Sequence, residues 1–104
     1  MILVLGSVVA KEGSIGEALD LSRQHVLRSR MEPGCLAHAV HKDTENPNRL
    51  VFVEQWASEE ALWAHFKVPD SRAFAKELAT LAAEPPSIAV YRASPVQLPG
   101  RNAA

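Results

Sequence analysis

The sixteen residues EQWASEEALWAHFKVP, Glu54 to Pro69, hold both tryptophans of the chain, one of its four histidines and one of its three phenylalanines. They overlap the run RLVFVEQWA, whose apolar, β-branched and aromatic side chains predict a strand over Arg49–Ala57. Ser58 is a favoured helix N-cap residue, and the two glutamates behind it suit the positive end of a helix. The stretch therefore predicts a strand that passes directly into a short helix, which Pro69 ends.

The segment before this junction predicts a strand, a helix and a second strand. Val, Ile and Leu dominate residues 2–10 and indicate a strand. The sequence SIGE predicts a capping box, with Ser14 as N-cap and Glu17 three residues later, and the helix should end near Met31, before EPG. The run CLAHAVHKD, residues 35–43, predicts another strand, joined to Arg49 by the turn-forming loop TENPN.

After Pro69 the pattern predicts a further helix from Asp70 or Ser71, with Phe74, Leu78 and Leu81 as its buried stripe, and a last strand over IAVYRA. The order is β-α-β-β-α-β, with the second helical region broken in two. We therefore expect an α+β ferredoxin-like fold with an antiparallel four-stranded sheet. It should occupy residues 1–94, and residues 95–104 should form an irregular tail.

Composition narrows the class of protein. The chain has 104 residues, enough for one domain, and a net charge of −1 with scattered Lys and Arg, so we expect no nucleic-acid and no membrane partner. Its opening apolar run lacks a basic region and is far shorter than the ~20 residues of a membrane helix. Cys35 is the only cysteine. We expect a cytoplasmic protein without an intrachain disulfide.

Both faces of the predicted sheet are apolar. In the third strand Phe52 and Trp56 point to one face, whereas Val51 and Val53 point to the other. The first and last strands also carry aliphatic residues on both faces. Helices can cover only one face, and a monomer rarely exposes a large apolar patch. The pattern therefore predicts a homodimer that packs sheet against sheet.

Three segments carry a resemblance to a known family: EPGC at residues 32–35, FVEQWAS at 52–58, and EEALWAHFKVPDSRAF at 59–74, with the spacing of Trp56, His65 and Pro69 as its clearest mark. The chain resembles the antibiotic biosynthesis monooxygenase (ABM) domain family over roughly residues 4–93, and it is similar to the bacterial quinol monooxygenases of that family. The resemblance implies a dimeric α+β barrel. It also implies oxygenation of a small quinol or polyphenol by molecular oxygen with no cofactor: no flavin, haem or metal.

His65 is the candidate catalytic residue. A neutral imidazole can take the proton of a phenol, and a phenolate gives an electron to oxygen more readily than a phenol does. The competing interpretation is structural, with His65 tying its helix to a backbone carbonyl. Five residues are candidates for substrate binding, and each could instead be an ordinary core or surface residue. They are Phe52, Trp56, Trp63, His25 and Tyr91.

Two further interpretations concern charge and metal. Glu54, on a largely apolar face, needs a partner such as Arg72 or Arg92 and is expected to be a structural anchor. His38 and His41 are three apart on a strand and point to opposite faces, so they cannot chelate together. We expect no metal site from this spacing.

Three other functions remain open from the sequence. The haem-degrading branch of the family pairs a first-strand Asn with a Trp and a His in the second helical region. Here those positions hold Gly6 or Ser7, His65, and Phe74 or Ala75, which argues against haem. A non-redox isomerase would use the same base. A non-catalytic small-ligand-binding protein of a stress response would need no base at all.

Overall fold

A computed structural model describes residues 1–100 and confirms the ferredoxin-like α+β fold. The elements run in the order β1 (Ile2–Val9), α1 (Ile15–Ser29), β2 (Cys35–Lys42), β3 (Arg49–Trp56), α2 (Glu59–Lys67), α3 (Pro69–Leu81) and β4 (Ser87–Arg92). The second helical region is broken in two, as the position of Pro69 predicted. No helix in this described part of the chain is long and apolar enough to cross a membrane.

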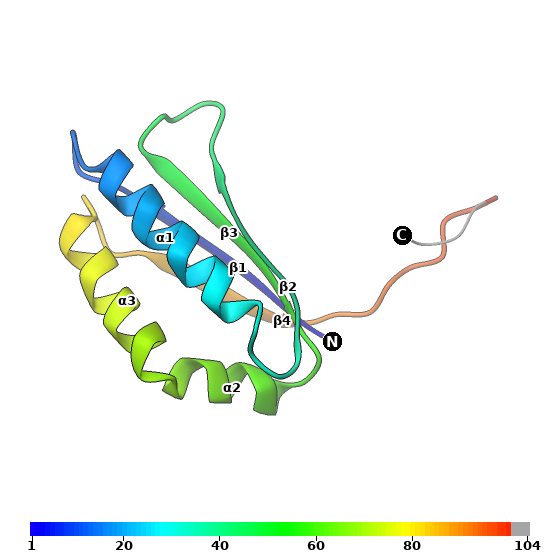
Figure 1. Ribbon diagram of the computed structural model, residues 1–104. Helices are drawn as coiled ribbons and strands as arrows, with labels where there is room; N and C mark the ends of the chain where they lie inside the picture. Colours follow the sequence, from blue (N-terminus) through cyan, green and yellow to red (C-terminus); the bar gives the residue numbers. More distant parts are fainter. Residues whose placement is uncertain (101–104) are drawn as a thin grey trace.

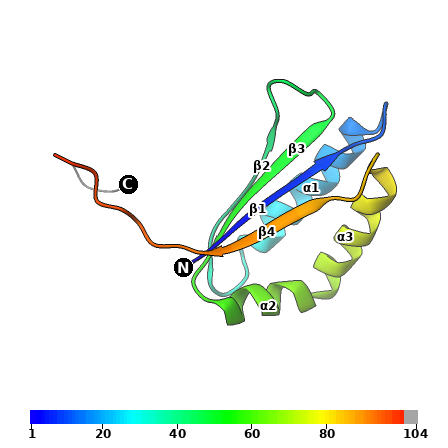
Figure 2. The ribbon, with the colours of Figure 1, turned by 180° about the vertical axis from the view of Figure 1, so that it is seen from behind.

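The four strands form one antiparallel sheet in the order β2-β3-β1-β4. Helices α1 and α3 lie across one face of the sheet, and α2 bridges its end beside the β2 and β3 termini (Figure 1). The view from behind shows the strands with no helix in front of them (Figure 2). The sheet thus has one covered face and one open face. Residues 94–100 lead away from it without regular secondary structure, and the last four residues of the predicted tail lie outside the described residues.

The core lies between the covered face and the helices. Strand β3 alternates strictly, with Leu50, Phe52, Glu54 and Trp56 buried beneath the helices. One apolar cluster joins Leu50 and Phe52 to Leu78 of α3. A second joins Trp56 to β1 and to α2. The predicted facing of the third strand is confirmed.

The open face is apolar on the central strands. Leu5 of β1 is 42% exposed, whereas its neighbour Val4 on the covered face is 0% exposed. Pairing places Leu5 between Val53 of β3 and Ala89 of β4 on that open face. Aliphatic side chains therefore continue across three strands with no helix over them.

Two helix starts differ from the sequence predictions. Ser14 has a helical backbone, with φ −104° and ψ −2°, and its side chain makes no capping hydrogen bond, so the predicted capping box does not form. Helix α3 begins at Pro69 rather than at Asp70 or Ser71. Proline suits the first helical position because that position needs no N–H donor, and the extended Val68 before it accepts the first backbone hydrogen bonds. The predicted cap at Ser58 is confirmed, since its hydroxyl accepts from the N–H of Ala61 at 3.1 Å.

A tight turn between α1 and β2 brings the helix end beside α2. Gly34 has φ +82°, and a Cβ at this residue would lie 2.5 Å from the Cβ of Ala61. Its carbonyl also accepts from the N–H of Ala57 at 2.8 Å. Only glycine can adopt this positive φ and leave room for the side chain of Ala61 without strain. The turn therefore fixes the position of Glu32, two residues earlier, against α2.

Candidate functional site

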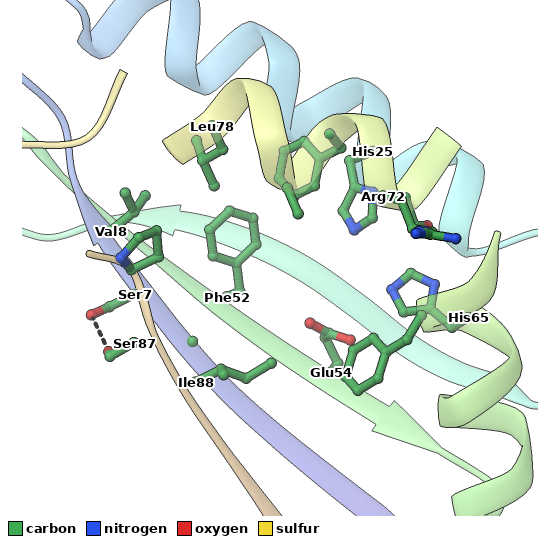
Figure 3. Close-up of a pocket in the computed structure, with 16 residues that line it drawn as sticks. Ser7, Val8, His25, Phe52, Glu54, His65, Arg72, Leu78, Ser87 and Ile88 are labelled. Carbon is green, nitrogen blue, oxygen red and sulfur yellow. Dashed lines mark hydrogen bonds between the residues drawn. The ribbon is translucent and has the colours of Figure 1, made fainter. Parts of the chain in front are cut away.

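A cavity of about 290 Å³ lies between the covered face of the sheet and helices α2 and α3. Figure 3 shows its two ends: His25, Glu54, His65 and Arg72 gather at one, and Val8 and Leu78 lie toward the other. Phe52, Phe66 and Phe74 also line it. The arrangement is an apolar slot with a few convergent polar groups at one end, which is the usual character of a small-molecule site.

His65 stands at the polar end with one ring nitrogen already engaged. Its Nδ1 lies 2.8 Å from Oε1 of Glu32, whose side chain comes from the turn after α1. A carboxylate accepts hydrogen bonds, so this contact places a ring proton on Nδ1, and in the neutral imidazole Nε2 then carries the lone pair. The indole of Trp56 lies against the ring, with centroids 4.6 Å apart. His65 is therefore buried, held on two sides, and able to accept a proton at Nε2.

Glu54 is anchored by its strand neighbour. The Nε1–H of Trp56 donates to Oε1 of Glu54 at 2.9 Å, and Nε2 of His38 lies 3.2 Å from the same oxygen. Burial, the strongest influence, raises the pKa of Glu54, but the contacts with His38 and Trp56 and the charge of His65 outweigh it and lower that pKa. Glu54 is thus held by Trp56 and His38, and of the two arginines named as possible partners, Arg92 pairs with Glu59 instead.

His25 of α1 completes the polar end of the cavity. Burial first, and then electrostatic repulsion from His38, His65 and Arg28, lower its pKa from 6.5 to about 3. A guanidinium only donates, so the 2.9 Å contact from Arg28 makes Nδ1 of His25 an acceptor and puts the ring proton on Nε2. The ring stacks on Phe74, with centroids 3.9 Å apart and planes 7° from parallel. His25 is thus a neutral imidazole in a fixed orientation.

Three histidines from three elements meet at this point. His25, His38 and His65 each present a nitrogen within 4.8 Å of one from each of the other two, and all three side chains are buried. His38 and His41 do point to opposite faces, as expected, with His41 exposed. The spacing argument compared two histidines of one strand, whereas the three clustered histidines come from α1, β2 and α2.

The structure separates the predicted substrate-binding residues into three groups. Phe52 and His25 line the cavity, together with His65. Trp56 is 0% exposed and supports the cavity from behind, through His65 and Glu54. Trp63 and Tyr91 do not line it. Trp63 is 43% exposed beside Phe66, and Tyr91, paired with Leu3, lies on the open face of the sheet.

Several site residues were missed by the sequence interpretation. The sequence interpretation treated Glu32 only as part of the signal that ends a helix. It treated His38 only as a buried histidine with its hydrogen bonds satisfied. Arg72 lines the cavity rather than pairing with Glu54, and Ser7 and Ser87, whose hydroxyls lie 3.1 Å apart, line its far end. Gly6 lies on the covered face, opposite Phe52, and this small residue in a strand was the one available sign of a space.

Comparison with known proteins gives a family and a relative. A family model described as antibiotic biosynthesis monooxygenase matches residues 1–77. The uncharacterized protein sll1783 of Synechocystis sp. is 31% identical over 96 residues, which is 92% of this chain. The chain spans 65% of the length of that relative.

Solved structures give the same fold. The crystal structure of an antibiotic biosynthesis monooxygenase is 26% identical, with a TM-score of 0.84, and the match covers 91% of this chain and all of that one. A conserved protein from Methanosarcina mazei Go1 is 24% identical, with a TM-score of 0.85, over 89% of this chain and 92% of its own. With a family match over most of its length, the chain belongs to the antibiotic biosynthesis monooxygenase family.

Proposed function

We propose that this protein is a cofactor-independent monooxygenase that oxidises a small quinol or polyphenol with molecular oxygen. The observation that carries the proposal is His65. Its Nδ1 is held by Glu32 at 2.8 Å, and its ring lines an apolar cavity. A positioned base with a free nitrogen at the edge of an aromatic-lined slot is the machinery that proton removal from a phenol needs. The cavity of about 290 Å³ favours a substrate with a single aromatic ring.

The reaction balances without an external reductant. Nε2 of His65 takes the phenolic proton, and the phenolate transfers one electron to oxygen. The resulting radical pair combines to a carbon-bound peroxide, which takes back the proton from Nε2 of His65 to become a hydroperoxide, and loss of one water leaves a hydroxylated quinone. One quinol and one oxygen molecule thus give one hydroxyquinone and one water. The substrate supplies all four electrons, two by becoming a quinone and two by hydroxylation.

A homodimer belongs to the same proposal. The open face carries Leu5 and Val53 on adjacent central strands, and Tyr91 lies on the same face of β4. A second copy laid face to face would remove this apolar surface from water, at roughly 25 cal/mol for each Å² buried. The two cavities would then lie on the outer sides of a paired sheet, one beneath each set of helices.

Oxygen uptake tests the function. Chelator-treated protein is mixed with a panel of hydroquinones and catechols in an oxygen-electrode cell, beside matched His65→Ala and His41→Ala variants. We expect uptake above autoxidation that His65→Ala abolishes and His41→Ala, an exposed histidine on the opposite face, retains. Uptake equal to autoxidation across the panel would remove the proposal. Turnover that continues without oxygen would instead favour the non-redox isomerase.

A further inference from the structure

The cluster of His25, His38 and His65 has a feature that the oxygenase proposal does not use. Both ring nitrogens of His38 are buried: Nε2 lies 3.2 Å from Oε1 of Glu54, whereas Nδ1 has no hydrogen-bond partner among the described residues. Buried polar atoms almost always have a partner, and the unpartnered Nδ1 asks for an explanation such as an ion. The two neighbouring rings each turn a nitrogen toward the same place.

We propose that these three histidines form a binding site for a divalent transition-metal cation of the Zn²⁺ class. Three nitrogens within 4.8 Å of one another enclose a point no more than about 2.8 Å from each. Zn–N bonds are about 2.0–2.1 Å long, so each imidazole needs to approach by less than an ångström. Neutral imidazoles favour Zn²⁺, Co²⁺, Ni²⁺ and Cu²⁺ over Mg²⁺ and Ca²⁺.

Two of the three rings already carry the partner that a metal-bound histidine needs. A ligating imidazole commonly offers its other nitrogen to a carboxylate, which fixes the ring and its tautomer. Glu32 holds Nδ1 of His65 at 2.8 Å, leaving Nε2, and Glu54 lies 3.2 Å from Nε2 of His38, leaving Nδ1. The two carboxylates also offset the charge of a divalent cation, so the cluster is prepared for a metal electrostatically as well as geometrically.

His25 is the ring that must change. In the metal-free protein Arg28 donates to its Nδ1, and the ring proton sits on Nε2. Metal binding at Nε2 requires that proton to move to Nδ1 and Arg28 to withdraw. The side chain of Arg28 is 32% exposed and lies 3.9 Å from the carboxylate of Asp70, so a second partner is within reach. Arg28 therefore opposes the metal, and its removal should tighten binding.

The cavity provides the way in and the open coordination position. His25 and His65 line it, whereas His38 is not among its lining residues. A cation held by these three histidines would have its fourth coordination position facing the cavity. Zinc sites with three protein ligands leave that position for water or substrate. If the proposed oxygenation uses Nε2 of His65, bound metal occupies that lone pair and suppresses turnover. The binding itself does not depend on the oxygenase proposal.

Metal titration of the untagged, chelator-stripped protein tests the site. We expect one equivalent of Zn²⁺ per chain against a chromophoric competitor, no competition by Mg²⁺, and a Co²⁺ adduct with the strong visible absorption of four-coordination. His25→Gln, His38→Ala and His65→Gln should each weaken Zn²⁺ binding by at least a hundredfold. His41→Ala should leave it unchanged, and Arg28→Gln should tighten it about tenfold.

Equal weakening by His41→Ala, or a stoichiometry well below one, would overturn the site and indicate adventitious binding. Circular dichroism of each metal-free variant shows whether it is folded. If His38→Ala fails to fold, the two cavity-lining variants carry the test, and retention of tight binding by both would refute the proposal. Failure of oxygen uptake by the metal-free protein would leave this result untouched.

Discussion

Nδ1 of His65 lies 2.8 Å from Oε1 of Glu32, across 33 residues of sequence. The contact joins the turn after α1 to the last turn of α2. It sets which nitrogen of His65 carries the proton, and so which one faces a substrate. Glu32 does not line the cavity, so its role in the proposed reaction is to position the base.

Glu32→Gln should lower kcat of the proposed oxygenation by roughly 10–100-fold and leave KM nearly unchanged, because the base loses its orientation while the cavity keeps its walls. Nitrogen-15 NMR of the imidazoles gives a second readout: His65 should be protonated at Nδ1 in the parent protein and mixed in the variant. Glu45→Gln, an exposed hairpin-loop residue, is the matched control. A change in KM alone would contradict this role.

Trp56→Phe should destabilise the protein by about 1–3 kcal/mol. The ring remains apolar, but buried Glu54 loses the N–H donor 2.9 Å away. Trp63→Phe removes the other indole from an exposed position and should cost less than about 0.5 kcal/mol. Urea unfolding followed by far-ultraviolet circular dichroism measures both. Equal midpoints for the two variants would mean that the Trp56–Glu54 hydrogen bond adds nothing to stability.

The sequence predicted the elements better than it predicted the site. Periodicity and Pro69 located the strands and the break between the helices because these signals are local. Alternation also placed Phe52, Glu54 and Trp56 on the covered face. His65 was identified as a candidate, but its contact with Glu32 escaped because no local pattern links residues 33 apart. The meeting of the three histidines likewise depends on how α1 and α2 pack beside the sheet.

Gly34→Ala should destabilise the fold by roughly 2–5 kcal/mol, since a Cβ there combines backbone strain with a 2.5 Å contact to Ala61. Gly13 separates these two effects. It also has a positive φ, of 83°, but nothing lies within 4 Å of the place that a Cβ would occupy there. Gly13→Ala should therefore cost only about 1 kcal/mol. Chemical denaturation of the pair measures the difference, and equal losses would show that the contact with Ala61 relaxes freely.

Cys35 should alkylate slowly at pH 8. Burial raises the pKa of its thiol above 9.0, and the nearby carboxylates of Glu32 and Glu54 add to this rise. The thiolate is the reactive form, so a raised pKa lowers its fraction at any pH below that value. The rate with iodoacetamide should climb through a midpoint above pH 9, and Glu32→Gln should move that midpoint down. The urea-unfolded chain is the reference, and a folded-state midpoint at or below that of the unfolded chain would contradict the direction of this shift.

Leu5→Glu should convert the proposed dimer to a monomer. Leu5 lies on the open face between Val53 and Ala89, where a sheet-to-sheet partner would bury its charged replacement without a counter-charge. Light scattering behind a sizing column should give twice the 11.3 kDa chain mass for the parent protein and a single chain mass for the variant. Leu27→Glu changes an exposed leucine on α1 and should keep the dimer. A parent protein that elutes as a single chain would refute the dimer. Dissociation of Leu27→Glu as readily as Leu5→Glu would place the dimer contact elsewhere, since only Leu5 lies on the open face.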